Sequence, residues 1–539
     1  MNTFHDREWG DGTESPAEFN PTELDCRQWI RELKNAGFKL AILTAKHHDG
    51  FCLWPSAYTE HSVKNSPYKN GKGDIVREFT DACREFGMKA GIYLSPWDRH
   101  EPTWGSEAYN DFYVGQLTEL MSNYGDIYEC WWDGAGSEKA HYDWERWGSV
   151  VRALQPNAVI FGSLGAAPYV DVRWVGNEKG IAGDPCWATV DMSSLERETP
   201  SELNSGDPNG SHFIPAEADV SLRPGWFWHE DQDGEIRSPE NLARLWFASV
   251  GRNGGLLLNV PPDNRGLIKD GDIASLKGFR RILDEGFEKN IAADGKMRAS
   301  SQRSPLCPPE AVTGGDRESF YSPADGDPCP TLELTFPQSV EFNCFVLSEV
   351  IELGQKIRGF ELWISRGGEW SKLLEGQCVG NKYARYFDRV SCEGVRLKIT
   401  QAVSAPLIRH LGLYSIADLT APDVINGFKR RDLAKSSSAK IERNREENEI
   451  YLQLGGIRLF NLLKVKGEGI KACSVYVFNG SSFEYVGDAR EGESPNEWIF
   501  PFEKMVDWSY RIKVKLLPEP DNTTVPLDDC SLSLYCSEG

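Results

Sequence analysis

The chain has 539 residues, more than one ordinary domain needs, and its 40% hydrophobic, 26% charged and 11% aromatic residues are typical of a globular protein. The formal net charge of −22 would repel phosphate backbones and anionic lipid surfaces, which argues against nucleic acid or a membrane as partner. There is no apolar run of the roughly 18 residues that a membrane span needs, and the first residues, MNTFHDREWGDG, do not form a signal peptide.

The numbers of cysteines and tryptophans further narrow the class of protein. Thirteen cysteines occur without a C-x-x-C pair, which disfavours a zinc knuckle and a dense disulfide framework. Eighteen tryptophans are more informative, because Trp supplies core bulk or stacks on flat ligands such as sugar rings. Three N-glycosylation sequons begin at Asn209, Asn479 and Asn522, about the number that chance gives, so they leave the compartment open.

From residue 39 to about residue 290, short apolar runs alternate with amphipathic helical stretches. Strands are expected at 39–45, 90–95, 127–132, 158–164, 212–217 and 255–260, and helices at 75–86, 110–124, 142–154, 239–250 and 273–287. This alternation predicts a parallel sheet, either doubly wound or closed into a (β/α)₈ barrel. Because no G-x-G-x-x-G follows the first strand, we prefer the barrel.

After about residue 296 the helical periodicity disappears. Short alternating segments such as TLELTF, FELWIS and VRLKIT are separated by Gly, Pro and Asp turns, which is typical of a β-sandwich. The sequence therefore predicts a catalytic barrel at 1–290, a β-sandwich at 296–416, a charged linker at 417–447 and an all-β module at 448–539.

In a parallel barrel the active-site side chains come from the C-terminal ends of the strands. The segments that follow the expected strands carry polar or aromatic groups that a purely structural strand end does not need; they are 46–51, 93–99, 131–135, 171–178 and 217–219. We therefore expect the site to be built from these segments.

His47 and His48 are adjacent, so their side chains point to opposite sides of an extended chain, and no spaced carboxylate or Cys nearby completes a metal site. We expect no metal. One ring could be buried and the other exposed, but the favoured interpretation is that both rings donate to ligand hydroxyls.

Asp133 follows the apolar segment 128–132, where an unpaired carboxylate would be costly to bury. It could be a helix N-cap, or it could be a nucleophile or base beside a partner carboxylate, for which Glu178 and Glu217 are the candidates. Hydrolysis of a glycosidic bond uses such a pair: one carboxylate attacks or activates water, and the other, with a raised pKa, protonates the leaving oxygen.

Nine ordered motifs now point to a family. They are DREWG, AKHHDGFCLWPS, KGDIVRE, GIYLSPWDR, CWWDGA, LQPNAVI, DVRWVGNE, PAEADVSLRPGWFWH and GRNGGLLLNVPPD. Together, over about residues 1–290, they resemble glycoside hydrolase family 29, the α-L-fucosidases. The segments HHDGFCLWPS and RWVGNE are most similar to the subgroup acting on α-1,3/1,4-linked fucose in branched Lewis-type glycans, and residues 297–414 resemble a discoidin-type sandwich.

The resemblance implies a retaining hydrolase without a cofactor, acting on fucosylated oligosaccharides or glycoproteins. Asp133 would be the nucleophile and Glu178 the general acid and base, with the two carboxyl groups about 5–5.5 Å apart. Glu217 is the competing acid, unless a buried ion pair with Arg223 explains it. The residues that would hold the fucose hydroxyls or its ring are Glu8, Trp9, His47, His48, Tyr93 and Trp131, and Trp226 would pack near the C5 methyl group.

One departure from the family pattern concerns the start of the chain. Family members begin the barrel with a strand ending in His-Phe/Trp-Gly just before the equivalent of Asn2, and this chain starts after it. We therefore expect a barrel whose first strand is truncated, or further sequence upstream. The alternatives are a fucosylated-glycan-binding protein that does not hydrolyse and a retaining glycosidase for another sugar. Family members are usually exported, which favours a periplasmic or extracellular location.

Overall fold

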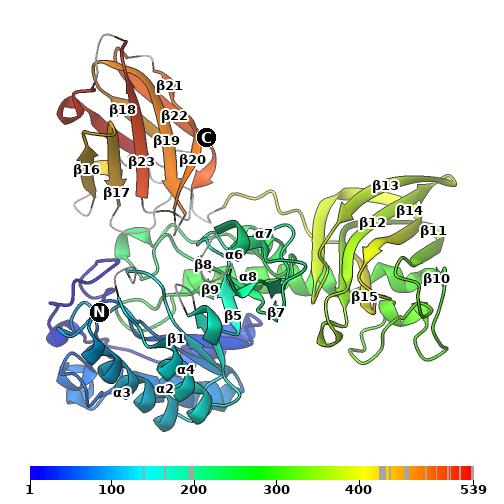
Figure 1. The fold of residues 1–539 in the computed structure, drawn as a ribbon, viewed down its shortest axis with the longest axis horizontal. Helices are drawn as coiled ribbons and strands as arrows, with labels where there is room; N and C mark the ends of the chain where they lie inside the picture. The colour runs from blue at the N-terminus through cyan, green and yellow to red at the C-terminus, as the bar shows by residue number, and fades with distance from the viewer. Residues whose placement is uncertain are drawn as a thin grey trace.

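The structure is a computed structural model that describes residues 1–136, 140–162, 166–193, 200–423, 433–435, 439–454, 460–479, 482–492, 494–506, 509, 511–520 and 524–535. Helices and a parallel sheet form the N-terminal region, and antiparallel sheets form the rest of the described chain (Figure 1). In that view the sheet of residues 296–414 lies beside the N-terminal region and the C-terminal sheets lie above it.

Seven parallel strands form the centre of the N-terminal region. In spatial order they are β1 (Leu40–Lys46), β2 (Lys89–Leu94), β3 (Glu129–Trp131), β4 (Val159–Gly162), β5 (Val172–Trp174), β8 (Ala216–Ser221) and β9 (Gly255–Asn259). Within the described residues no ladder joins β1 to β9, so the sheet curls as a barrel does without closing. The expected barrel is therefore present as an open, curled parallel sheet.

Helices connect and cover these strands. They are α1 (Cys26–Asn35), α2 (Ile75–Phe86), α3 (Glu107–Asn123), α4 (Trp144–Leu154), α6 (Pro200–Ser205), α7 (Pro239–Ala248) and α8 (Asp270–Phe287). The helix predicted at 75–86 is confirmed to the residue: the Asp74 side chain accepts from the backbone N–H of Arg77, and Gly87 ends the helix at φ 62°. Sequence reasoning did not predict α1.

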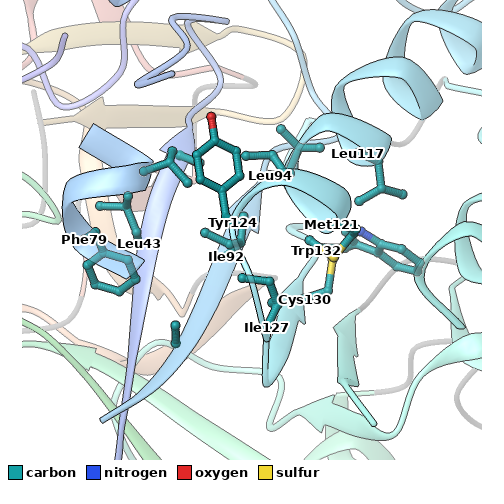
Figure 2. Close-up of a cluster of buried hydrophobic side chains, with 14 of the residues drawn as sticks. Leu43, Phe79, Ile92, Leu94, Leu117, Met121, Tyr124, Ile127, Cys130 and Trp132 are labelled. Atoms are coloured by element: carbon teal, nitrogen blue, oxygen red, sulfur yellow. The ribbon is translucent and has the colours of Figure 1, made fainter. Parts of the chain in front are cut away.

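The predicted apolar helix faces pack on the sheet. Phe79 of α2 and Leu117 of α3 lie against side chains of the first strands (Figure 2), among them Leu43 and Ile92. Each fully buried side chain of this size stabilises the fold by about 1.5–3 kcal/mol relative to exposure. This layer fixes the strand ends from which the site is built.

The strand predicted at 212–217 is wrong in its limits. Residues 212–213 form β7 (His212–Phe213), which pairs with β6 (Thr189–Val190), and the barrel strand β8 begins only at Ala216. Glu217 and Asp219 are consequently inside a strand, on the same side of the chain, and not in the loop beyond it.

The middle region is one antiparallel sheet. Its strands are β10 (Lys296–Ala299), β11 (Thr331–Glu349), β12 (Ile357–Arg366), β13 (Glu369–Gly376), β14 (Tyr383–Ala402) and β15 (Ile408–Tyr414). Its contact with the N-terminal region contains an apolar layer, in which Val346, Tyr414 and Ile416 belong to one buried cluster with side chains of α7 and α8. Polar contacts lie beside this layer, among them the Arg385–Asp184 ion pair at 2.7 Å. Ile416 fits so closely against α8 that a Cβ on Gly286 would come within 2.6 Å of its Cδ1.

Two antiparallel sheets share a core in the C-terminal region. The first contains β16 (Lys440–Asn444), β17 (Glu449–Gln453), β23 (Arg511–Pro518), β19 (Ile470–Phe478) and β20 (Phe483–Asp488), and the second contains β21 (Arg490–Glu491), β22 (Glu497–Val506), β18 (Phe460–Lys466) and β24 (Ser531–Tyr535).

The stretch 417–447, predicted as a linker, is described at both of its ends. Strand β16 lies inside it, and Asp423 accepts a hydrogen bond of 2.8 Å from Asn241 of α7. The residues 424–432 and 436–438 of this stretch lie outside the described residues. We keep the limits 1–290, 296–416, 417–447 and 448–539 as proposals. Among the described helices there is none with the length and apolarity that crossing a membrane requires.

Candidate active site

The side chains predicted to form the site gather at the carboxyl end of the parallel sheet. They follow or end β1, β2, β3, β5 and β8, the positions at which parallel barrels carry their chemistry. The N-terminal segment, with Glu8 and Trp9, joins them from the side: the Trp9 ring lies 5.9 Å from the ring of His48.

Asp133 lies just beyond β3 and is fixed by three neighbours. Its Oδ2 accepts a hydrogen bond of 2.7 Å from the Tyr93 hydroxyl, its Oδ1 accepts one of 2.8 Å from the backbone N–H of Ala135, and His48 Nε2 lies 3.8 Å from Oδ2. The side chain keeps 24% exposure, so a ligand can reach it. The helix N-cap interpretation is wrong, because α4 begins at Trp144 and Asp143 caps it.

The two histidine rings lie in contact, with centroids 3.9 Å apart and ring planes inclined by 36°, and neither ring is exposed. Ser95 Oγ lies 2.8 Å from His48 Nδ1, and Asn2 Nδ2 donates to His47 Nδ1 at 3.2 Å. Burial lowers the pKa of both imidazoles, so the rings are neutral at pH 7. The His47 proton is consequently on Nε2. Across the described residues, no three His, Cys, Asp or Glu side chains are grouped so that they could hold a metal.

Aromatic rings surround these polar groups. Trp131 stacks between Tyr93, at a centroid distance of 5.2 Å, and Phe161, at 4.0 Å. Phe227 meets the His47 ring edge-on at 4.9 Å, and sequence reasoning missed it. These rings give the site an aromatic wall, which suits a sugar ligand.

Glu178 lies beyond β5, in the segment 175–181. Its Oε2 atom is buried with no hydrogen-bond partner in the described part of the chain. Desolvation by burial raises the pKa of Glu178 well above its usual value, and the negative charges of Asp219, Asp133 and Glu8 raise it further. Four carboxyl groups thus share one electrostatic neighbourhood.

Glu217 has a different partner from the one expected. Its Oε1 accepts a hydrogen bond of 3.1 Å from Trp131 Nε1, and burial raises its pKa to about 7. Arg223 instead pairs with Asp272 at 3.0 Å and Asp233 at 3.1 Å, so the predicted Glu217–Arg223 ion pair is wrong.

Two further carboxyl groups belong to this cluster: Asp219, from the predicted segment 217–219, and Glu129, which sequence reasoning missed. Burial raises the pKa of Asp219 to about 7, although Trp174 Nε1 donates to it at 2.8 Å. Burial, followed by the charge of Glu217, raises the pKa of Glu129 on β3 to about 9. Asp219 and Glu217 lie on the same side of β8, so both face the cluster. The position of Glu129 within an apolar run gave no functional signal.

Glu8 is bound to the segment 225–229. Its Oε2 lies 3.0 Å from His229 Nε2, and its Oε1 accepts from the backbone N–H of Trp226; His229 Nδ1 in turn lies 2.6 Å from Asp6. The structure thus brings Glu8 and Trp226 together, as the predicted site requires, through a histidine that sequence reasoning missed.

The profile of a known family matches residues 1–285, more than half of the chain; its description is α-L-fucosidase. The chain belongs to the α-L-fucosidase family, glycoside hydrolase family 29. One relative, α-L-fucosidase 1 of Arabidopsis thaliana, is 42% identical over 425 residues, which cover 77% of this chain and 83% of the plant protein.

Solved structures of family 29 have the same architecture. A family member from an unknown rumen bacterium is 32% identical, with a TM-score of 0.70, and the match covers 95% of this chain and 92% of that one. A Ruminococcus gnavus family 29 fucosidase solved in complex with fucose is 31% identical, with a TM-score of 0.72, over 78% of this chain and 92% of that one. The chain is accordingly a glycoside hydrolase whose substrates are fucosylated glycans, and a binding protein that does not hydrolyse is not favoured.

Proposed function

We propose that this family 29 enzyme is a retaining α-L-fucosidase that removes α-1,3/1,4-linked L-fucose from branched glycans. The observation that carries the proposal is the contrast between two carboxyl groups. Asp133 is oriented by Tyr93, Ala135 and His48, whereas burial and neighbouring negative charge raise the pKa of Glu178. Retaining glycosidases need one carboxylate aimed at the anomeric carbon and one carboxyl that keeps its proton.

In the first step an oxygen of Asp133 attacks C1 of the fucose, and the bond from C1 to the glycosidic oxygen breaks. Glu178 gives its proton to that oxygen, so the remaining glycan leaves as an alcohol and a covalent fucosyl-enzyme remains. In the second step Glu178, now a carboxylate, takes a proton from water, and the water oxygen displaces Asp133 from C1. Two displacements return the sugar with its original anomeric configuration.

The remaining predicted residues bind the sugar. The His47 Nε2–H is available for a fucose hydroxyl because Nδ1 is bonded to Asn2. His48, Trp9 and Trp131 would hold hydroxyls or the ring, and Trp226 would pack near the C5 methyl group. The backbone N–H of Trp226 and the ring of His229 orient Glu8, which leaves its outer lone pairs for a hydroxyl.

The choice between Glu178 and Glu217 as acid can be tested with matched variants. Glu178→Ala should abolish release from a Lewis trisaccharide, keep part of the activity on an aryl α-L-fucoside with a good leaving group, and regain activity with azide. Glu217→Ala should show no azide rescue, because Trp131 holds that carboxyl group. Rescue of the Glu217 variant alone would reverse the assignment.

The nucleophile and the stereochemistry need separate measurements. Asp133→Ala should lower kcat on every fucoside by on the order of 10³-fold or more, since it removes covalent catalysis. Nuclear magnetic resonance of the first product formed by the wild-type enzyme should show α-L-fucose. If β-L-fucose appears first, the enzyme inverts and the proposal is wrong.

The linkage is the part of the proposal that rests on the segments HHDGFCLWPS and RWVGNE. Release from Lewis trisaccharides with α-1,3- or α-1,4-linked fucose, much faster than from an α-1,2-linked trisaccharide, is the expected result. Comparable rates on all three linkages would overturn the linkage preference and leave the fucosidase activity standing.

A further inference from the structure

The hairpin between β19 and β20 of the C-terminal region reaches the segment that carries Glu178. The backbone N–H of Glu178 donates to the carbonyl oxygen of Asn479 at 3.2 Å. The next residue, Lys179, places its Nζ 2.6 Å from Glu484 Oε2, across 305 positions of sequence. Figure 1 shows the ends of β19 and β20 directed toward the N-terminal region.

The contacting atoms of the hairpin are held by its own interactions. Asn479 is buried, with 3% exposure; its Nδ2 donates to Glu484 Oε1 at 2.8 Å, and its Oδ1 accepts from the backbone N–H of Ser482 at 2.8 Å. The rings of Phe478 and Phe483 meet at a centroid distance of 5.4 Å. The hairpin therefore presents a fixed carbonyl oxygen and a fixed carboxylate.

On the other side of the contact, Glu178 occupies a tight turn. Gly176 and Gly180 flank it with φ of 79° and 69°, values that favour glycine. Asn177 Oδ1 accepts from the backbone N–H of Lys179 at 3.0 Å, and the backbone N–H of Gly180 donates to the carbonyl oxygen of Asp219 at 2.9 Å. The turn is thus bound to β8 at one end, and to the hairpin at the position of Glu178 itself.

We infer that the C-terminal module is part of the catalytic apparatus, with Asn479 and Glu484 acting as positioning residues that hold the backbone of Glu178 over the fucose site. This inference rests on the proposed role of Glu178 as the acid. The hydrogen bond to the Asn479 carbonyl fixes the backbone position of Glu178, and therefore the position of its Cα–Cβ bond. The Lys179–Glu484 ion pair holds the hairpin against this backbone.

The contact suits positioning better than attachment. The Lys179 side chain is 19% exposed and that of Glu484 is 44% exposed, so solvent screens the pair and it adds little to stability. A directional hydrogen bond and a short ion pair nevertheless define geometry, and a misplacement of about 1 Å at a reacting group can lower a rate by roughly 100-fold.

The charged groups around Glu178 decide the expected pH effect. Asp219, Asp133 and Glu8 face its carboxyl group from the parallel-sheet side, whereas Lys179 and Glu484 lie at its backbone. If the hairpin moves away, water enters beside Glu178 and its pKa falls toward the ordinary range. The upper limit of the pH–activity profile should then move to lower pH.

The test uses Glu484→Gln in the full-length protein, with Glu497→Gln as matched control. The new amide oxygen can still accept from Asn479, but the charge facing Lys179 is lost; Glu497 pairs with Lys464 inside the C-terminal module, at 3.6 Å. We expect Glu484→Gln to lower kcat/KM on a Lewis trisaccharide by about 3- to 10-fold. On an aryl fucoside whose leaving group needs no proton, the loss should be less than about 2-fold.

A second variant controls for activity that is lost because a single substitution disturbs the fold. The charge-swapped double variant Lys179→Glu with Glu484→Lys should recover part of the trisaccharide activity that either single swap loses. The recovery is partial because a lysine at position 484 cannot accept the hydrogen bond from Asn479. Equal losses on the trisaccharide and the aryl fucoside, an unmoved pH profile, or a Glu484→Gln enzyme identical to the Glu497→Gln control would each overturn the inference.

The same experiment separates this inference from the proposed function. If Glu178→Ala keeps full trisaccharide activity, Glu178 is not the acid and the proposed assignment fails. If Glu178→Ala is inactive on the trisaccharide and Glu484→Gln behaves as the control, the acid is correct and only the positioning role of the C-terminal module fails.

Discussion

The sheet of residues 296–414 meets the N-terminal region through an apolar layer on α7 and α8, flanked by polar contacts such as Arg385–Asp184, whereas the C-terminal module meets Glu178 and Lys179 through a hydrogen bond and an ion pair. Apolar burial is strong and non-directional, and salt does not screen it as it screens charges. A half-exposed polar contact is weak and screened, but it specifies the position of particular atoms. The apolar layer is suited to attaching the middle sheet to the N-terminal region. The polar contact is suited to positioning the reacting carboxyl group of Glu178.

The largest effect should come from placing a charge in the apolar layer. Ile416→Asp buries an unpaired carboxylate at a residue with 1% exposure, which should lower the free energy of unfolding by about 4 kcal/mol or more. The matched control is Leu306→Asp in the same module, where the side chain is 90% exposed. Thermal denaturation should separate the two variants widely, and similar Tm values would contradict the apolar contact.

The second-largest effect concerns a buried carboxyl group in the parallel sheet, within one region of the molecule. Glu129 has its pKa raised by burial and by Glu217 from 4.5 to about 9, so the native state keeps a proton that the unfolded chain loses above pH 4.5. Stability from this group is full below pH 4.5 and is lost as pH rises toward 9.

Glu129→Gln removes this titration. At pH 8 the variant should be more stable than the wild type by on the order of 3 kcal/mol, and the difference should vanish near pH 4. Chemical denaturation across this pH range measures it, with Glu369→Gln, at an exposed position of β13, as control. Parallel stability curves for the Glu129 variant and the wild type would contradict the raised pKa.

A smaller effect compares two tyrosine hydrogen bonds of equal length, one at the active site and one in the hydrophobic core. Tyr93→Phe removes the 2.7 Å hydrogen bond to Asp133 and should lower kcat/KM about tenfold while barely changing Tm. Tyr113→Phe removes a 2.7 Å bond to the carbonyl of Leu94, on the same strand, and should lower Tm without changing kcat/KM. The reverse pattern would show that Tyr93 has only a structural role.

The smallest effect concerns salt. Raising NaCl from about 0.05 M to about 1 M should screen the Lys179–Glu484 pair and reduce trisaccharide hydrolysis by less than about 3-fold. Glu484→Gln should lose this salt dependence, and the Tm of both proteins should change in parallel. A salt effect of the same size in the variant would mean that another charge pair is responsible.

Much of the parallel sheet followed from the sequence because local pattern determines it. The run 39–45 and the helix 75–86 carry their periodicity and caps in adjacent residues, and the structure places β1 and α2 within a residue of the predicted limits. The limits of the strand at 212–217 failed because Phe213 and Ile214 extend the apolar pattern toward the N-terminus, whereas pairing with β6 takes His212 and Phe213 out of the parallel sheet.

For the site, sequence reasoning could predict which strand ends carry polar groups but not how those groups are paired. The Trp131–Glu217 hydrogen bond, the Arg223–Asp272 ion pair and the Glu8–His229 contact join residues 49 to 221 positions apart, and no spacing rule connects them. The contact between Glu178 and Asn479 joins two regions of the chain through backbone atoms, so the local sequence around neither residue could have predicted it.

Asn479 has a practical consequence for making the enzyme. It begins the sequon Asn-Gly-Ser, and the amide nitrogen that a transferase would modify is bonded to Glu484 in a side chain with 3% exposure. A eukaryotic secretory host attaches sugars during synthesis, before this side chain is buried. Such a host would therefore release protein carrying an N-glycan for which the buried side chain leaves no room, and a bacterial host avoids that outcome.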